Sequence, residues 1–347
     1  MKEIFESTLE RILKDHVSAE AVIACENADW PTAMWSTIEE SGFTLAVVPE
    51  EFGGTGASWS DVSGLIQLCG QYALPIPLPE AILSNWLLGQ CGSEPVAGPL
   101  TFGAIADLKL DADGISGSIQ QIPWGRHQGH VLALVTNNDG QDVVVLDIAE
   151  AAEIIEESNT AGEPRDTLVF KSATPFRSAA LVAPLQADVL FKAGAMLRSA
   201  QTAGALMALL DMASRYANER SQFGKPIAKF QAIQHQLAVL AEHTMAAKIA
   251  ALAAFSESDI ELASLQIMAA KICSGEAAGI GAGIAHTVHG AIGFTHEYSL
   301  HIFTRRLWSW RSEFGSAAYW SQILGKEICR SGPEQLWPSV TRGALPA

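Results

Sequence analysis

The stretch that decides the fold reads Tyr216-Ala-Asn-Glu-Arg-Ser-Gln-Phe-Gly-Lys-Pro-Ile-Ala-Lys-Phe-Gln-Ala-Ile-Gln-His235. It joins two regions with the apolar spacing of helices, and Gly224 and Pro226 mark a loop between them. Arg220 stands where this loop begins, and a guanidinium there could make two parallel hydrogen bonds to a diphosphate. Phe223 offers an apolar face to an aromatic ring. Without further context, Arg220 could equally be a solvated or ion-paired side chain, and Phe223 a core residue.

A second distinctive segment reads His289-Gly-Ala-Ile-Gly-Phe-Thr-His-Glu-Tyr-Ser-Leu-His301, with Arg305-Arg306 after it. Its glycines permit a backbone to approach a ligand closely, although glycines also mark ordinary turns. A third and weaker motif is Val48-Pro-Glu-Glu-Phe-Gly-Gly-Thr-Gly56. The three motifs span most of the chain, so they carry more weight together than any one of them alone.

Together these segments resemble, in the same order, those of the acyl-CoA dehydrogenase flavoproteins. The first resembles the family's ER-x-x-F-G-x-x-I-x-x-F-Q-x-I-Q-H segment, and the second resembles H-G-G-x-G-F-T-x-E. The resemblance implies FAD at a subunit interface, where the matching arginine, phenylalanine and glutamine hold the diphosphate and adenine of a neighbouring subunit's cofactor. The positions that the resemblance places in FAD contact are Arg220, Gln222, Phe223, Gln231, Thr287, Gly290 and Ala291.

The residue composition changes twice along the chain. Residues 1–98 and 188–330 have helical spacing of apolar residues, whereas residues 99–187 contain short β-branched runs such as Val143-Val-Val-Leu146 and turns such as Asn138-Asp-Gly140. Residues 331–347 contain three prolines and are predicted to be an irregular tail. The predicted fold is α+β and mostly α: an N-terminal helical domain, a small central antiparallel β domain and a C-terminal helix bundle, as in acyl-CoA dehydrogenases.

The residue composition excludes several classes of binding partner. A formal net charge of −16 argues against nucleic acid and against an anionic membrane surface. The five cysteines contain no CxxC pair, which is typical of reduced thiols in a cytoplasmic protein. The N-terminus lacks an apolar signal core and no apolar run of membrane-spanning length is evident, so no membrane insertion is expected. Four histidines cluster between His286 and His301, but no HExxH motif accompanies them, so no metal is predicted.

The chain departs from the family where the chemistry occurs. Dehydrogenation of an acyl-CoA needs a base for the α-proton and a flavin that takes the β-hydride. In the family the base is a glutamate at one of two positions, which fall here on Phe314 and near Gly194. Glu313 is one residue early, and an offset of about 100° along a helix would turn it away. The catalytic base is therefore unknown, with Glu313 a weak candidate.

The flavin-ring contacts depart as well. The family's Thr-Glu-Pro…Gly-Ser-Asp and Trp-x-Thr-Asn motifs are not recognisable in Thr101–Asp107 or Ile122–His127, and Thr287 and Ala291 replace a usual glutamine and glycine. Groups that reach into a neighbour's FAD site are mostly kept, whereas those that build the chain's own site are mostly lost.

This pattern resembles a heteromeric acyl-CoA dehydrogenase, a type that occurs in bacterial degradation of steroid side chains. The expected partners are an acyl-CoA from steroid or fatty acid degradation, a larger homologous subunit or a second copy, and electron-transfer flavoprotein as acceptor. Two alternatives remain open: a structural subunit without cofactor, and a homomeric dehydrogenase with a displaced base.

Overall fold

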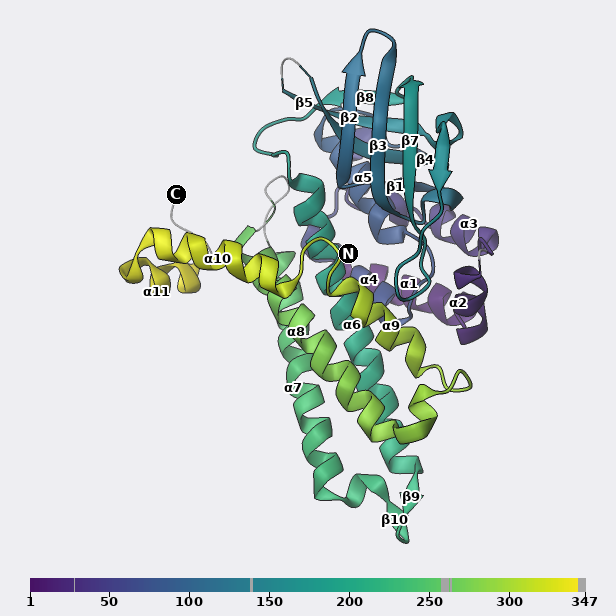
Figure 1. Cartoon of the computed structure of the whole chain (residues 1–347), viewed down its shortest axis with the longest axis vertical. Helices are drawn as coiled ribbons and strands as arrows, with labels where there is room; N and C mark the ends of the chain where they lie inside the picture. The colour runs from purple at the N-terminus through teal and green to yellow at the C-terminus, as the bar shows by residue number, and fades with distance from the viewer. Residues whose placement is uncertain (28, 138–139, 257–261, 263, 343–347) are drawn as a thin grey trace. The chain divides into compact units, whose positions relative to one another are not determined.

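The computed structural model describes residues 1–27, 29–137, 140–256, 262 and 264–342. Helices occupy the chain up to Gln90, strands lie between Leu100 and Ala180, and helices follow from Val189 onward (Figure 1). The predicted α+β fold with its central sheet is therefore confirmed. Asn138 and Asp139 of the predicted turn, and residues 343–347 of the predicted tail, lie outside the described residues.

The helices before the sheet are α1 (Lys2–His16), α2 (Ala19–Glu26), α3 (Thr32–Glu40), α4 (Trp59–Gln71) and α5 (Leu78–Gln90). Those after it are α6 (Val189–Glu219), α7 (Gln231–Ala254), α8 (Ser264–His289), α9 (Leu300–Trp310), α10 (Ala317–Ser331) and α11 (Pro333–Arg342). The strands of the main sheet are β1 (Leu100–Phe102), β2 (Ile105–Asp111), β3 (Gly114–Pro123), β4 (His130–Thr136), β5 (Gln141–Asp147), β6 (Glu153–Ile155), β7 (Arg165–Ala173) and β8 (Arg177–Ala180).

The described residues form two compact units. The first contains Met1–Leu65 and Leu74–Gly194, and the second contains Ile66–Ala73 and residues 195–256 and 264–342. The N-terminal helices and the sheet therefore fall largely within one unit. The predicted boundaries at residues 98 and 187 coincide with changes of secondary structure, between α5 and β1 and between β8 and α6, and stay predictions as domain limits.

The sheet has the strand order β6-β7-β3-β2-β4-β5-β8, with β1 beside β4. Most neighbours are antiparallel, as predicted, but β1 and β2 each pair with β4 in parallel. Alternating apolar residues of the strands face one core, because successive side chains of a strand point to opposite faces. That core contains Ile115, Ile119, Val131, Val144, Leu146, Leu168 and Phe170 among others.

Two helical stretches of the second unit, Gln231–Ala254 and Ser264–Phe294, are long and apolar enough to cross a membrane by length and composition. The prediction that no such stretch exists is therefore wrong, because polar residues such as Glu242, Lys248 and Lys271 interrupt these stretches and no continuous apolar run is visible. The two helices pack against each other (Figure 1), and a core helix of a soluble protein passes the same test. Only 28% of the apolar stretch in α7 is buried, against 56% of the stretch within Ser264–Phe294.

The predicted irregular tail is also wrong for residues 333–342, which form α11. Pro333 begins this helix, where its fixed φ angle favours a helix and its missing N–H would have no partner anyway. Leu336, Trp337 and Val340 lie at helical spacing and are exposed, with Trp337 72% exposed.

Helices α4 and α6 cross at backbone distance within the second unit. A Cβ atom added to Gly70 would lie 1.9 Å from the Gln201 carbonyl oxygen, and one added to Gly204 would lie 1.9 Å from that of Gln67. Each helix therefore presents a glycine to the other's backbone. Glycine is the residue that permits so close an approach.

We expect Gly70→Ala and Gly204→Ala each to lower the free energy of unfolding by about 1–3 kcal/mol, because the added methyl group forces the two helices apart. Alanine otherwise favours a helix, so Gly283→Ala in α8 is the matched control. Gly283 has nothing within 4 Å of its Cβ position, and we expect its substitution to stabilise the protein slightly. Urea denaturation measures all three variants. Equal effects at the three positions would contradict the close crossing.

Candidate functional site

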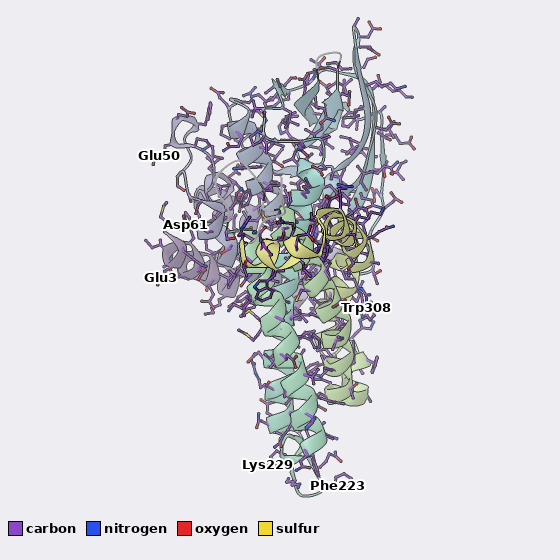
Figure 2. The ribbon with its side chains drawn as sticks, turned by 90° about the vertical axis from the view of Figure 1, so that its left-hand side faces the viewer. Glu3, Glu50, Asp61, Phe223, Lys229 and Trp308 are labelled. Carbon is purple, nitrogen blue, oxygen red and sulfur yellow. The ribbon has the colours of Figure 1, made fainter. Side chains whose placement is uncertain are left out.

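The loop between α6 and α7 folds as a tight hairpin. β9 (Ser221–Gln222) pairs antiparallel with β10 (Lys225–Pro226), and the two residues between them have positive φ angles, 52° at Phe223 and 78° at Gly224. Two such residues form the turn that best matches the twist of a two-residue hairpin. Phe223 is 92% exposed, so it is not a core residue. Figure 2 shows Phe223 at the tip of the helical region, with Lys229 beside it.

The backbone of Arg220 is hydrogen-bonded on both sides, whereas its side chain is exposed. Its amide nitrogen donates to the Tyr216 carbonyl at 2.8 Å, and its carbonyl accepts from the Ile227 nitrogen at 2.8 Å. The side chain is exposed, as are those of Gln222 and Gln231, the first residue of α7. Three hydrogen-bonding side chains that the family resemblance assigns to FAD contact thus lie exposed on one short segment.

The glycine segment comes to the same region through a shared core. Val288 of α8 packs in one apolar cluster with Ala217, Leu240 and the partly buried Tyr216 and Ile227. The Tyr216 ring stacks on His289 at 4.6 Å between centroids, and His289 Nε2 lies 3.2 Å from the Tyr298 hydroxyl oxygen. Burial lowers the pKa of His289. The two sequence segments are therefore joined by α6 and α8.

Gly290 directly follows this buried histidine. It has a φ angle of 63° and no heavy atom within 4 Å of its Cβ position, so its backbone faces open space. Ala291 and Thr287 are exposed too. The Thr287 hydroxyl donates to the Gly283 carbonyl at 2.8 Å, so it is bonded to its own helix.

The neighbouring histidines have local partners. His286 stacks on Phe294 at 4.5 Å, and the rings of His296 and His301 lie 5.1 Å apart. Over the described part of the chain, no group of three or more histidine, cysteine or acidic side chains is placed to hold a metal ion.

The segments at the family's flavin-ring positions use their polar groups internally. The buried Thr101 hydroxyl donates to the Pro123 carbonyl at 2.9 Å. Trp124 is 3% exposed, and the Arg126 guanidinium is ion-paired with the buried Asp166. These groups are satisfied within the sheet unit itself.

Glu313 does not lie on a helix, so the helical-offset argument for its direction was wrong. Helix α9 ends at Trp310, and the next residues form a turn in which Phe314 has a φ angle of 52°. Within that turn the Glu313 carboxylate is bound by Arg198, with Nε 2.7 Å from Oε2. Gly194 lies on α6 one turn before Arg198.

A buried lysine contacts the last residue of α9, just before this turn. Lys271 of α8 is 1% exposed and donates to the Trp310 carbonyl at 2.6 Å. Desolvation lowers its pKa to about 7, against an opposing effect of Glu313. Sequence reasoning missed both Arg198 and Lys271. The available signal was a single cation directly after each of the apolar runs Ala195–Leu197 and Ile267–Ala270.

Comparison with known proteins relates this sequence to a known family. The sequence model for the acyl-CoA dehydrogenase C-terminal domain matches residues 186–328, which contain both segments described above. Residues 186–328 form a C-terminal domain of the acyl-CoA dehydrogenase type. The relatives that are named acyl-CoA dehydrogenases are oxidoreductases.

The similarity to this family extends over the whole chain. The acyl-CoA dehydrogenase IpdE2 of Mycobacterium tuberculosis is 26% identical over 97% of this chain and 98% of its own. The solved structure of the Tcur3481-Tcur3483 steroid ACAD has a TM-score of 0.83 at 22% identity and covers 94% of this chain and 97% of that one. The ChsE4-ChsE5 complex from Mycobacterium tuberculosis has a TM-score of 0.82 at 17% identity, over 95% and 98%. At these identities the two structures establish the acyl-CoA dehydrogenase fold.

The buried lysine generates a pH prediction. Between about pH 7 and the ordinary lysine pKa, the unfolded chain binds a proton that folded Lys271 does not, so the free energy of unfolding should rise with pH. We expect a rise of about 1 kcal/mol per pH unit, and its loss in Lys271→Met. The charged groups acting on Lys271 are Glu313, Arg198 and Arg311, which stay unchanged in this variant.

Urea denaturation from about pH 7 to about pH 9 measures this difference. Lys326→Met removes an exposed lysine of α10 and should retain the wild-type pH dependence. Parallel curves for wild type and Lys271→Met would show that Lys271 stays charged throughout this range.

Proposed function

We propose that this chain is a subunit of a FAD-dependent acyl-CoA dehydrogenase and that it contributes FAD contacts in trans to a catalytic partner. The observation that carries the proposal is the exposed hairpin with Arg220 and Phe223, in a chain that has no carboxylate at Gly194 or Phe314. The reaction is the α,β-dehydrogenation of an acyl-CoA thioester. The partner supplies the base.

The exposed residues fit one part of FAD. Arg220 provides a bidentate donor for a diphosphate, Gln231 an amide, and Phe223 an aromatic face. Lys225 adds a cation, with Nζ 4.4 Å from the centre of the Phe230 ring. The open backbone at Gly290 leaves room for close approach. These groups would bind and orient the diphosphate and adenine, while the flavin supplies hydride acceptance when FAD is bound.

The residues at the chain's own flavin-ring positions fit the cofactor less well. The Thr101 hydroxyl and the Arg126 guanidinium are already bonded within the sheet unit. Glu313 is bound by Arg198, which argues against a homomeric enzyme that uses Glu313 as its base. These observations favour a division of labour between two different subunits.

An exposed apolar face supports a protein partner. Val239, Met245 and Ile249 of α7 are 38%, 48% and 62% exposed, and Ile280 of α8 is 41% exposed. Large exposed apolar patches commonly mark protein interfaces. We infer that a homologous, larger subunit covers this face, and that a second copy is the alternative.

The substrate class and acceptor follow from similarity alone. One similar structure is described as a steroid ACAD and another as a two-component complex. We therefore propose an acyl-CoA from steroid degradation as the substrate, with fatty acyl-CoA as the alternative, and electron-transfer flavoprotein as the acceptor. We propose a cytoplasmic location, without membrane insertion.

The FAD assignment is tested with Arg220→Ala in the assembled complex. Loss of a charge-assisted contact to the diphosphate should weaken FAD binding roughly ten- to a hundred-fold, or by about 1.5–3 kcal/mol. Flavin fluorescence titration of the apo complex measures the dissociation constant.

The control is Arg330→Ala, which removes an exposed arginine of α10 that pairs with Glu327. It should leave FAD affinity unchanged, and both variants should keep the wild-type melting temperature without FAD. An unaltered dissociation constant in Arg220→Ala would remove Arg220 from the FAD site.

The division of labour predicts that the chain alone turns over acyl-CoA slowly or not at all. Removal of a general base usually costs about a hundred- to ten-thousand-fold in rate. The measurement compares the purified chain, the chain assembled with its partner, and the partner alone, using an artificial electron acceptor. Turnover by the pure chain at the rate of the complex would refute the proposal.

A further inference from the structure

The second unit contains a buried cluster of charges that the proposed function does not use. Arg198 and Lys271 are 2% and 1% exposed, and they lie on two different helices, α6 and α8. Both meet the end of α9 and the turn that follows it. Arg198 contacts Glu313 of this turn, and Lys271 donates to the Trp310 carbonyl just before it.

The charges of this cluster are unequal. Among the described residues, the groups that act on Lys271 are the carboxylate Glu313 and the cations Arg198 and Arg311. A guanidinium stays charged in a protein, so burying Arg198 without an anion would cost several kcal/mol. The Glu313 carboxylate therefore stabilises the buried Arg198 guanidinium.

The neighbours of Arg198 also fix the position of its guanidinium group. Its guanidinium carbon lies 6.0 Å from the centre of the Trp310 ring and 5.6 Å from that of Phe314, and Gln201 accepts a hydrogen bond from it. These neighbours fix the guanidinium so that Nε points at the Glu313 carboxylate, 2.7 Å away. The Glu313 side chain is 15% exposed, so this carboxylate reaches the edge of the solvent-accessible surface.

We infer that Arg198 forms a carboxylate-binding site, which the chain fills with its own Glu313, while Lys271 holds the Trp310 carbonyl just before the turn. The turn at the family's base position is thereby fixed by a ligand that belongs to the same chain. Glu313 acts as this internal ligand, and Arg198 and Lys271 are positioning residues for the turn. The site accepts a small carboxylate of the formate or acetate class when the Glu313 side chain is removed.

The experiment is chemical rescue of Glu313→Ala, the variant that empties the site. We expect a lower melting temperature than wild type, and a saturable rise when formate is added in the millimolar range at constant ionic strength with chloride as the balancing anion. A ligand that binds only the folded state stabilises it in this way. Asp211→Ala, which removes the carboxylate of an exposed pair with Arg215, is the control and should show no formate-specific rise.

A second comparison holds even if Glu313→Ala folds poorly. Glu313→Gln leaves Arg198 charged and buried, whereas Arg198→Met with Glu313→Gln removes both charges. The double variant should melt at a higher temperature than Glu313→Gln, because removing one member of a buried pair costs more than removing both. A formate response equal to that of wild type, or a double variant less stable than Glu313→Gln, would overturn the inference.

Discussion

The candidate site depends on one apolar contact, the packing of Val288 of α8 against α6 and α7. Residues from three helices meet there: Ala213 and Ala217 from α6, Leu240 from α7 and Val288 itself. Because this cluster lies just before both the hairpin and the glycine segment, it brings together two motifs that are far apart in sequence. The polar residues outside it are free to face a ligand, since they do not hold the helices together.

The division between used and exposed polar groups follows from this arrangement. In the sheet unit, the Thr101 hydroxyl donates to the Pro123 carbonyl and Arg126 is paired with Asp166. In the helical unit, Arg220 and Gln231 keep their side chains at the surface. A polar group satisfied in the folded chain gains little from a ligand, whereas an exposed one on a rigid backbone can bind without reorganisation. The same chain thus has its polar groups bonded internally in one region and exposed to solvent in another.

The fold and the loop between α6 and α7 could be predicted from sequence because their signals are local. Helical spacing, the Phe223-Gly224 turn and the Arg220 segment each occupy a short stretch of chain. The errors arose where distant residues decide. The pairing of Arg198 with Glu313 spans 115 residues, and no local pattern indicates it. The argument for the direction of Glu313 assumed that α9 continues, whereas the chain turns with positive φ angles at Phe314 and Gly315.

The exposed face of α7 has a consequence for how the cell must make this protein. Val239, Met245 and Ile249 present apolar surface on a helix whose composition would also suit a lipid bilayer. A chain produced in excess of whatever covers this helix is prone to aggregation and to degradation by quality control. For the proposed two-subunit enzyme, matched synthesis is the simplest remedy, in which two genes are transcribed together so that each new chain meets its counterpart soon after translation.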